Sequence, residues 1–160
     1  MATHKLLLDD DFEYDFLLLA IHTSLEAYQI AFALNKSLGL QLARRPEDLN
    51  LIKEKHQANF SLFEYENKRD YVTYHLFSNK TKTLLENVAQ GLFSDEREIL
   101  VRDLFINDLP KVDFFLKVYD EANAFAKTKV FKQINDIPQI VTAYTVDIDK
   151  LKTRQNLIFE

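Results

Sequence analysis

Residues 58–78 read ANFSLFEYENKRDYVTYHLFS, and this stretch decides the predicted fold class. Its two ends are rich in residues that favour β-strands, such as Phe, Tyr, Val and Thr. Between them, a polar run around Asn67, Lys68 and Arg69 supplies a turn. The stretch is therefore predicted to form a β-hairpin, which points to an antiparallel sheet.

A second hairpin is predicted from Ile99–Ile106 and Val112–Tyr119. In the second of these segments, apolar residues at every other position alternate with Asp113, Phe115, Lys117 and Tyr119. Such a period of two is typical of a strand, and we expect one of its faces to be core. Turn residues, including Asp108 and Pro110, connect the two segments.

The chain also predicts a strand at Lys5–Leu8, a strand at Phe16–His22 and then a helix. Thr23, followed three residues later by Glu26, matches a capping box that would begin this helix. Apolar residues recur at helical spacing as far as Leu38, and Gly39 stands where a helix ends.

A second helix is predicted after Asp120, which would cap it. Pro138 ends this helix, and a strand is expected at Ile140–Ile148. If the strands before and after this helix share a sheet, their connection should be right-handed. The helix is defined by a helically spaced stripe formed by Ala122, Ala126, Val130 and Ile134.

These elements predict one α+β domain over residues 1–160, with a single, mainly antiparallel sheet built from hairpins. Two principal helices are expected to pack on one face of this sheet. Residues 149–160 are expected to form a docked C-terminal tail, because Leu157, Ile158 and Phe159 are too apolar to remain loose in solvent.

Composition bounds the class of protein. The chain of 160 residues has a formal charge of −5, which weakens long-range attraction to nucleic acid and to anionic membranes. It contains no Cys, which excludes disulfides and thiol chemistry and suits the cytoplasm. The longest apolar run, Phe16–Ile21, is too short to span a bilayer. We therefore expect a cytoplasmic protein.

The segment INDLPKVDF, residues 106–114, resembles the motif of the IPExxxVDY family of small bacterial proteins. Asn107 replaces the motif's Pro, Asp108 its Glu and Phe114 its Tyr. Residues 20–36 and 143–159 resemble two further segments of that family. The resemblance implies no activity, substrate or cofactor, because none is assigned to the family. It does imply a link to genes neighbouring ribonuclease III and pyruvate kinase.

The motif residues are interpreted as structural. They are Ile106, Asp108, Pro110, Val112, Asp113 and Phe114. Asp and Pro occupy turns for local reasons, and we expect Asp113 to cap or orient the connection. A role that needs the hydroxyl of the motif's Tyr cannot operate with Phe114 in that place. A catalytic role of the two aspartates is the less favoured alternative.

An acidic cluster and a histidine each allow either a functional or a purely structural interpretation. Asp9, Asp10, Asp11, Glu13 and Asp15 could hold a metal ion, but a solvated acidic turn is the favoured reading. His22, near Ser24, could be catalytic at the end of its strand. A hydrogen-bonded histidine beside a helix cap is favoured instead, because no nucleophile elbow accompanies it.

Basic residues raise an RNA-binding alternative, since basic rims with aromatic platforms bind single strands. They are Lys68, Arg69, Lys80, Lys82, Lys150, Lys152 and Arg154. The leading hypothesis is a non-enzymatic interaction protein, an adaptor or small regulatory subunit, which binds a protein partner or a second copy. The alternative is an RNA-associated accessory factor linked to RNA processing, and an enzyme using His22 comes third. No cofactor, metal or catalytic residue is assigned.

Overall fold

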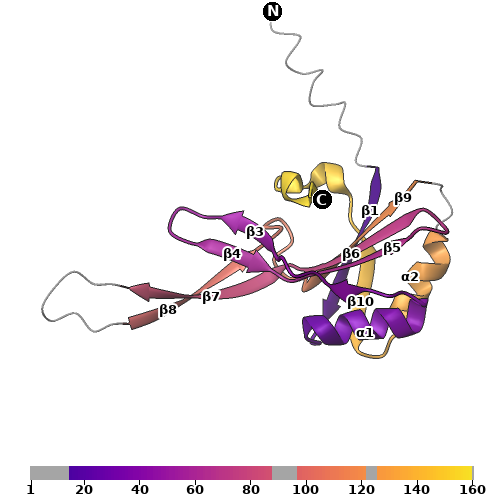
Figure 1. The fold of residues 1–160 in the computed structure, drawn as a ribbon, viewed down its shortest axis with the longest axis horizontal. Coiled ribbons are helices and arrows are strands. Elements are labelled where there is room, and N and C mark those ends of the chain that lie inside the picture. The colour runs from indigo at the N-terminus through magenta and orange to yellow at the C-terminus, as the bar shows by residue number, and fades with distance from the viewer. Residues whose placement is uncertain (1–14, 88–96, 122–125, 160) are drawn as a thin grey trace, which may run out of the picture.

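A computed structural model of the chain describes residues 15–87, 97–121 and 126–159, and within them the fold is α+β. Its centre is an antiparallel six-stranded sheet (Figure 1). In spatial order, the strands are β10 (Ile140–Thr145), β1 (Phe16–Thr23), β9 (Phe114–Asp120), β6 (Val72–Ser78), β5 (Leu62–Asn67) and β2 (Ala43–Arg44). No described helix has the length and apolar character needed to cross a membrane.

Two further hairpins lie outside this sheet. One pairs β3 (Leu49–Ile52) with β4 (Gln57–Phe60), and the other pairs β7 (Lys80–Asn87) with β8 (Arg97–Leu104). Figure 1 shows the β7–β8 pair projecting from the body of the molecule as an arm, which we call the β7–β8 arm.

The hairpin predicted at 58–78 is confirmed for its inner part, β5 and β6, which pair from Leu62↔Phe77 to Asn67↔Val72. Residues 58–60 were wrongly assigned to it, because they belong to β4 and pair with β3. The second predicted hairpin is wrong, because β8 pairs with β7 whereas β9 pairs with β1 and β6. One face of β9 is core as expected, with Phe114, Leu116 and Val118 beneath the helices, but the opposite face is buried too. Phe114 and Phe115, which point to opposite faces, are both buried. A strand that is apolar on both faces belongs in the centre of a covered sheet, where it cannot be one half of an outlying hairpin.

The first helix, α1 (Ala27–Leu38), has its N-cap three residues after the predicted cap, Thr23. The N-cap is Glu26, whose backbone N–H donates to Oε1 of Gln29 over 2.9 Å. Thr23 is still in β1, and its hydroxyl donates to the carbonyl oxygen of Gln139 over 2.8 Å. Gly39 ends the helix as predicted, with a left-handed φ of 66° that favours glycine.

The second helix, α2 (Lys127–Asn135), ends before Pro138 as predicted. Asp120 does not cap it, because Asp120 pairs with Val72 as the last residue of β9. The N-cap is Ala126, and Ala122 lies outside the described residues, as does the strand predicted at Lys5–Leu8. Strands β9 and β10 both run antiparallel to β1, which lies between them, so they are parallel to each other. The right-handed connection between them stays a prediction.

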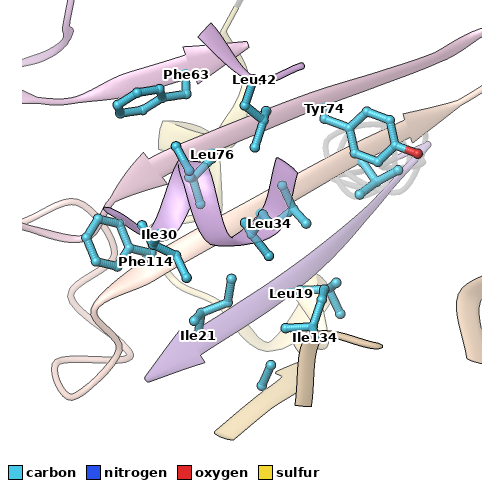
Figure 2. Packing of buried hydrophobic residues seen from close by; sticks show 14 of the residues in the cluster. Leu19, Ile21, Ile30, Leu34, Leu42, Phe63, Tyr74, Leu76, Phe114 and Ile134 are labelled. Atoms are coloured by element: carbon cyan, nitrogen blue, oxygen red, sulfur yellow. The ribbon is translucent and has the colours of Figure 1, made fainter. Parts of the chain in front are cut away.

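Each face of the sheet has its own core. Both helices cover one face, as predicted, and Figure 2 shows Ile30, Leu34 and Ile134 of these helices packing against sheet residues such as Leu19 and Leu76. The other face is covered by the β3–β4 hairpin, the connection 105–112 and residues 146–159, which we call the C-terminal segment. The predicted strand at Ile140–Ile148 ends at Thr145, and 3₁₀ turns follow at Ile148–Lys150 and Arg154–Leu157.

One asparagine in each helix binds backbone near an edge of the sheet. Asn135 donates to the carbonyl oxygen of Ala143 in β10 and accepts from its N–H, over 3.1 and 2.9 Å. Asn35 makes the same pair of bonds to Leu42, just before β2. These side chains satisfy backbone groups that an edge strand would otherwise expose to another chain.

Candidate functional site

The motif-like segment 106–114 is organised around the buried side chain of Asn79. Its Oδ1 accepts from the N–H of Ile106 over 2.7 Å, and its Nδ2 donates to the carbonyl oxygens of Leu109 and Val112 over 2.9 and 3.0 Å. Ile106 and Val112 are buried on the face opposite the helices, whereas Phe114 is buried beneath the helices. Pro110 is exposed in the turn.

Asp113 joins this segment to the end of β1. Its Oδ2 accepts from the backbone N–H of Thr23 over 3.0 Å, and its Oδ1 forms an ion pair with Nζ of Lys80 over 2.9 Å. Its own N–H donates to the carbonyl oxygen of Ile21. Both carboxylate oxygens of Asp113 are therefore bound, one by a backbone amide and one by an ammonium group. These two bonds orient the connection that leads into β9.

Asp108 binds the C-terminal segment. Its carboxylate accepts from the N–H of Lys152 over 3.1 Å, from the N–H of Thr153 over 3.0 Å and from the hydroxyl of Thr153 over 2.7 Å. The bond from the Thr153 hydroxyl and those from the two amides hold the pKa of Asp108 below its usual range. This aspartate is thus an anchor for the chain end, a role for which its place in a turn gave no signal.

The three apolar residues of the chain end take different positions. Leu157 is fully buried among the residues on this face of the sheet, and the ring of Phe159 packs edge-on against Phe77 and His75. Ile158 instead points outward, with 59% of its surface exposed. The expected apolar anchor therefore consists of Leu157 and Phe159.

A row of polar side chains crosses three strands beneath this chain end. Glu64, His75 and Lys117 are cross-strand neighbours, and Nε2 of His75 lies 2.7 Å from Oε2 of Glu64. Nζ of Lys117 donates to the carbonyl oxygen of Leu157 over 2.8 Å and lies 4.2 Å from the ring centre of Phe159. His75 and Lys117 are buried under apolar side chains, whereas Glu64 is partly exposed and also pairs with Arg45.

Burial shifts the pKa of two members of this row, His75 and Lys117. It lowers the pKa of Lys117 to about 8, because the ammonium group loses its hydration. Burial also lowers the pKa of His75, although Glu64 opposes this effect, and Nδ1 of His75 has no hydrogen-bond partner in the structure. The alternation in β9 indicates that Lys117 points to the face of the sheet away from Phe114, Leu116 and Val118. Nothing in the sequence indicated that this second face is buried too.

The structure gives His22 one side-chain hydrogen bond, between its Nε2 and the hydroxyl of Tyr144 over 3.1 Å, and the two rings stack. Ser24 is exposed and makes no bond to His22. Among the described residues, no group of three His, Asp or Glu side chains could hold a metal ion. Of the predicted acidic cluster, only Asp15 is described, and Asp9, Asp10, Asp11 and Glu13 lie outside the described residues.

The basic candidates are distributed over three places. Lys68 and Arg69 lie in the β5–β6 turn, whereas Lys80 and Lys82 lie beyond the opposite end of β6. Seven strand residues span roughly 23 Å, so these two pairs are far apart. Lys150, Lys152 and Arg154 belong to the C-terminal segment, where Lys150 pairs with Asp147 and Arg154 donates to the carbonyl oxygen of Asp149.

A groove of about 1010 Å³ lies between the two helices. Its apolar wall includes Leu25, Ala33, Ile137 and Pro138, and glutamine side chains at positions 29, 133 and 139 also line it. Tyr28 and Phe32, one helical turn apart on α1, border the groove with 66% and 68% of their surfaces exposed. The sequence contained a signal for this surface, since both rings fall outside the buried stripe of the helix.

Together, the fold and these contacts define an α+β protein. Its motif residues Asp108 and Asp113 bind other segments of the chain, and the exposed rings of Tyr28 and Phe32 border a groove. No known protein family, curated protein or solved structure matches this chain. The resemblance to the IPExxxVDY family therefore stays a prediction.

Proposed function

We propose that the protein is a non-enzymatic interaction protein, an adaptor or small regulatory subunit, whose groove between α1 and α2 binds a peptide segment of a partner protein. The exposure of Tyr28 and Phe32 at the edge of this groove carries the proposal. Large aromatic side chains supply most of the binding energy in many interfaces, because they bury much apolar area when a partner covers them.

The lining of the groove suits a peptide. Apolar atoms form most of the groove surface, so an apolar side chain of the partner would lose its contact with water there. The amide groups of Gln29, Gln133 and Gln139 both donate and accept hydrogen bonds, as a peptide backbone requires. We place this function in the cytoplasm, because a chain without Cys suits a reducing compartment.

The test uses a photo-crosslinking amino acid at position 32 of the full chain, expressed in the native cell. The matched control carries the same amino acid at position 71, because Tyr71 is similarly exposed, at 64%, in the β5–β6 turn. We expect position 32, but not position 71, to crosslink to a defined peptide of one protein. With that protein purified, Phe32→Ala should weaken binding at least tenfold and leave the melting temperature unchanged. Equal crosslinking from both positions would contradict the proposal.

The alternative function is an RNA-associated accessory factor, and it depends on the basic residues in the β5–β6 turn, after β6 and near the chain end. It predicts an electrophoretic shift with single-stranded or structured RNA that weakens steeply as salt rises. No shift at low salt would remove it. The third hypothesis, an enzyme using His22, predicts that His22→Ala abolishes an activity without lowering thermal stability.

A further inference from the structure

The β7–β8 arm presents an ordered pattern of side chains on one face. Its register places Lys82 opposite Arg102, Leu84 opposite Leu100 and Glu86 opposite Glu98. Residues two positions apart on a strand point to the same face, so these three rungs follow one another along the arm. All six residues are exposed, with Leu84 at 63% and Leu100 at 47%.

This pattern does not stabilise the arm itself. Like charges directly opposite each other destabilise a pair of strands, and both charged rungs pair like with like. Within the described residues, the structure shows no ion pair that involves Lys82, Arg102, Glu86 or Glu98. An isolated two-stranded hairpin is marginally stable in water, and this one leaves its leucine rung open to solvent. A partner that covers the face would satisfy these residues.

The order of the rungs is self-complementary. The basic and acidic rungs lie at equal distances on either side of the leucine rung, about 7 Å away, because each is two residues along the strand. Consider a two-fold axis that lies between two facing arms and runs parallel to the leucine rung. Rotation about this axis exchanges the basic and the acidic positions. A second arm placed face to face in this way brings leucine onto leucine and each basic rung onto an acidic one.

We propose that this face of the β7–β8 arm binds the same face of a second copy of the chain. The interface is isologous, as in most two-fold homodimers. It uses different residues from the groove between α1 and α2, so it stands or fails independently of the proposed peptide-binding function. Figure 1 shows the arm extending away from the six-stranded sheet and both helices, with the β3–β4 hairpin near its base.

The size of the face sets the expected strength of association. Two strands of eight residues present a face on the order of 250 Å², compared with roughly 800 Å² per partner in a stable interface. The dimer is therefore weak and depends on protein concentration. Since its charges are exposed, added salt weakens it further.

The experiment is sedimentation velocity of the full chain from micromolar to near-millimolar concentration, with four matched proteins. They are the wild type, the all-basic arm E86K/E98K, the all-acidic arm K82E/R102E and the exchanged arm that carries all four substitutions. Each variant keeps like charges opposite each other, so the cross-strand balance within one arm is preserved. Circular dichroism checks that each variant folds.

We expect the wild type and the exchanged arm to dimerise with similar affinity. The all-basic and all-acidic arms should each remain monomeric alone, and their equimolar mixture should dimerise again. Because the chain has no cysteine, a single Leu84→Cys gives an independent readout. It should oxidise to a linked dimer at least tenfold faster than a Tyr71→Cys control.

Three results would overturn the proposal. The wild type could sediment as a monomer at every concentration, its association could be unaffected by either pair of charge reversals, or the mixture of the two reversed arms could fail to restore the dimer. The second result would place a dimer interface on another surface. The first result would indicate that the exposed arm binds a different protein and not a second copy of this chain.

Discussion

The ammonium group of Lys117 donates a hydrogen bond to the backbone carbonyl oxygen of Leu157 over 2.8 Å, which ties the central strand β9 to the C-terminal segment. The side chain of Leu157 is fully buried on the same face. We expect Leu157→Ala to lower the free energy of unfolding by about 2–5 kcal/mol, as other buried leucines do when truncated. Its matched control is Ile158→Ala, which should cost about 0.5 kcal/mol or less because Ile158 is exposed.

Denaturant unfolding measures both changes. Equal effects of the two variants would contradict the docked position of the chain end.

The lowered pKa of Lys117 predicts a dependence of stability on pH. The folded state releases the proton at about pH 8, whereas the unfolded chain holds it up to about 10.5. Between these values the unfolded state binds more protons, so the contribution of Lys117 to stability rises with pH. It is fully present above the unfolded pKa and is lost as the pH falls through about 8.

This dependence is isolated by comparison with Lys117→Met, which keeps an apolar chain of similar length but cannot titrate. The free energy of unfolding of the wild type, relative to this variant, should rise between about pH 7.5 and pH 9.5, with a limiting slope of about 1.4 kcal/mol per pH unit. Parallel curves for the two proteins would show that Lys117 is hydrated in the folded state.

The buried amide of Asn79 is expected to be among the most sensitive positions. Asn79→Ala leaves the N–H of Ile106 and two carbonyl oxygens without their partners, which should cost about 3 kcal/mol or more. Asn59→Ala is the control, because Asn59 also begins an Asn-x-Ser/Thr sequence but is exposed on β4. Thermal unfolding should separate the two variants by several degrees or more. Similar melting temperatures would contradict the role of Asn79.

Asp113→Ala should lower the free energy of unfolding by about 0.5–2 kcal/mol, comparable to the loss of a helix cap, because the N–H of Thr23 loses its acceptor. Lys80→Ala removes only the ion pair and should cost about 1 kcal/mol or less, since Lys80 is exposed. An Asp113→Ala protein that remains fully stable but loses partner binding would instead place Asp113 in a binding surface.

Asp108→Asn tests the anchor of the C-terminal segment. The loss of the negative charge weakens the bonds from the Thr153 hydroxyl and from the two backbone amides. We expect faster hydrogen exchange at the amides of Lys152 and Thr153, with little change in the β5–β6 hairpin. Asn107→Ala, at the exposed neighbouring position, is the control and should leave exchange unchanged. Because hydrogen bonds lower the pKa of Asp108, its contribution to stability is present above the unfolded value of 3.8 and is lost as the pH falls through the folded value.

Local sequence determined the elements whose signals lie within a few residues. The β5–β6 hairpin, the end of α1 at Gly39 and the end of α2 before Pro138 follow from strand-forming residues, a turn, a left-handed glycine and a helix breaker. The α+β class and the placement of both helices on one face followed from these elements, because each apolar stripe must be buried against something.

Tertiary structure alone decided which strands pair. The alternation in β9 and the apolar content of β8 predict strands, but they carry no information about partners when the connection between them allows a hairpin. Because β9 is apolar on both faces, it lies in the centre of the covered sheet, between β1 and β6, and not in a hairpin with β8. The same burial placed Lys117 beneath Phe159, a residue more than 40 positions away in the sequence. Contacts of that separation depend on the whole fold, which is why the spacing of residues could predict a docked chain end but not the side chains that hold it.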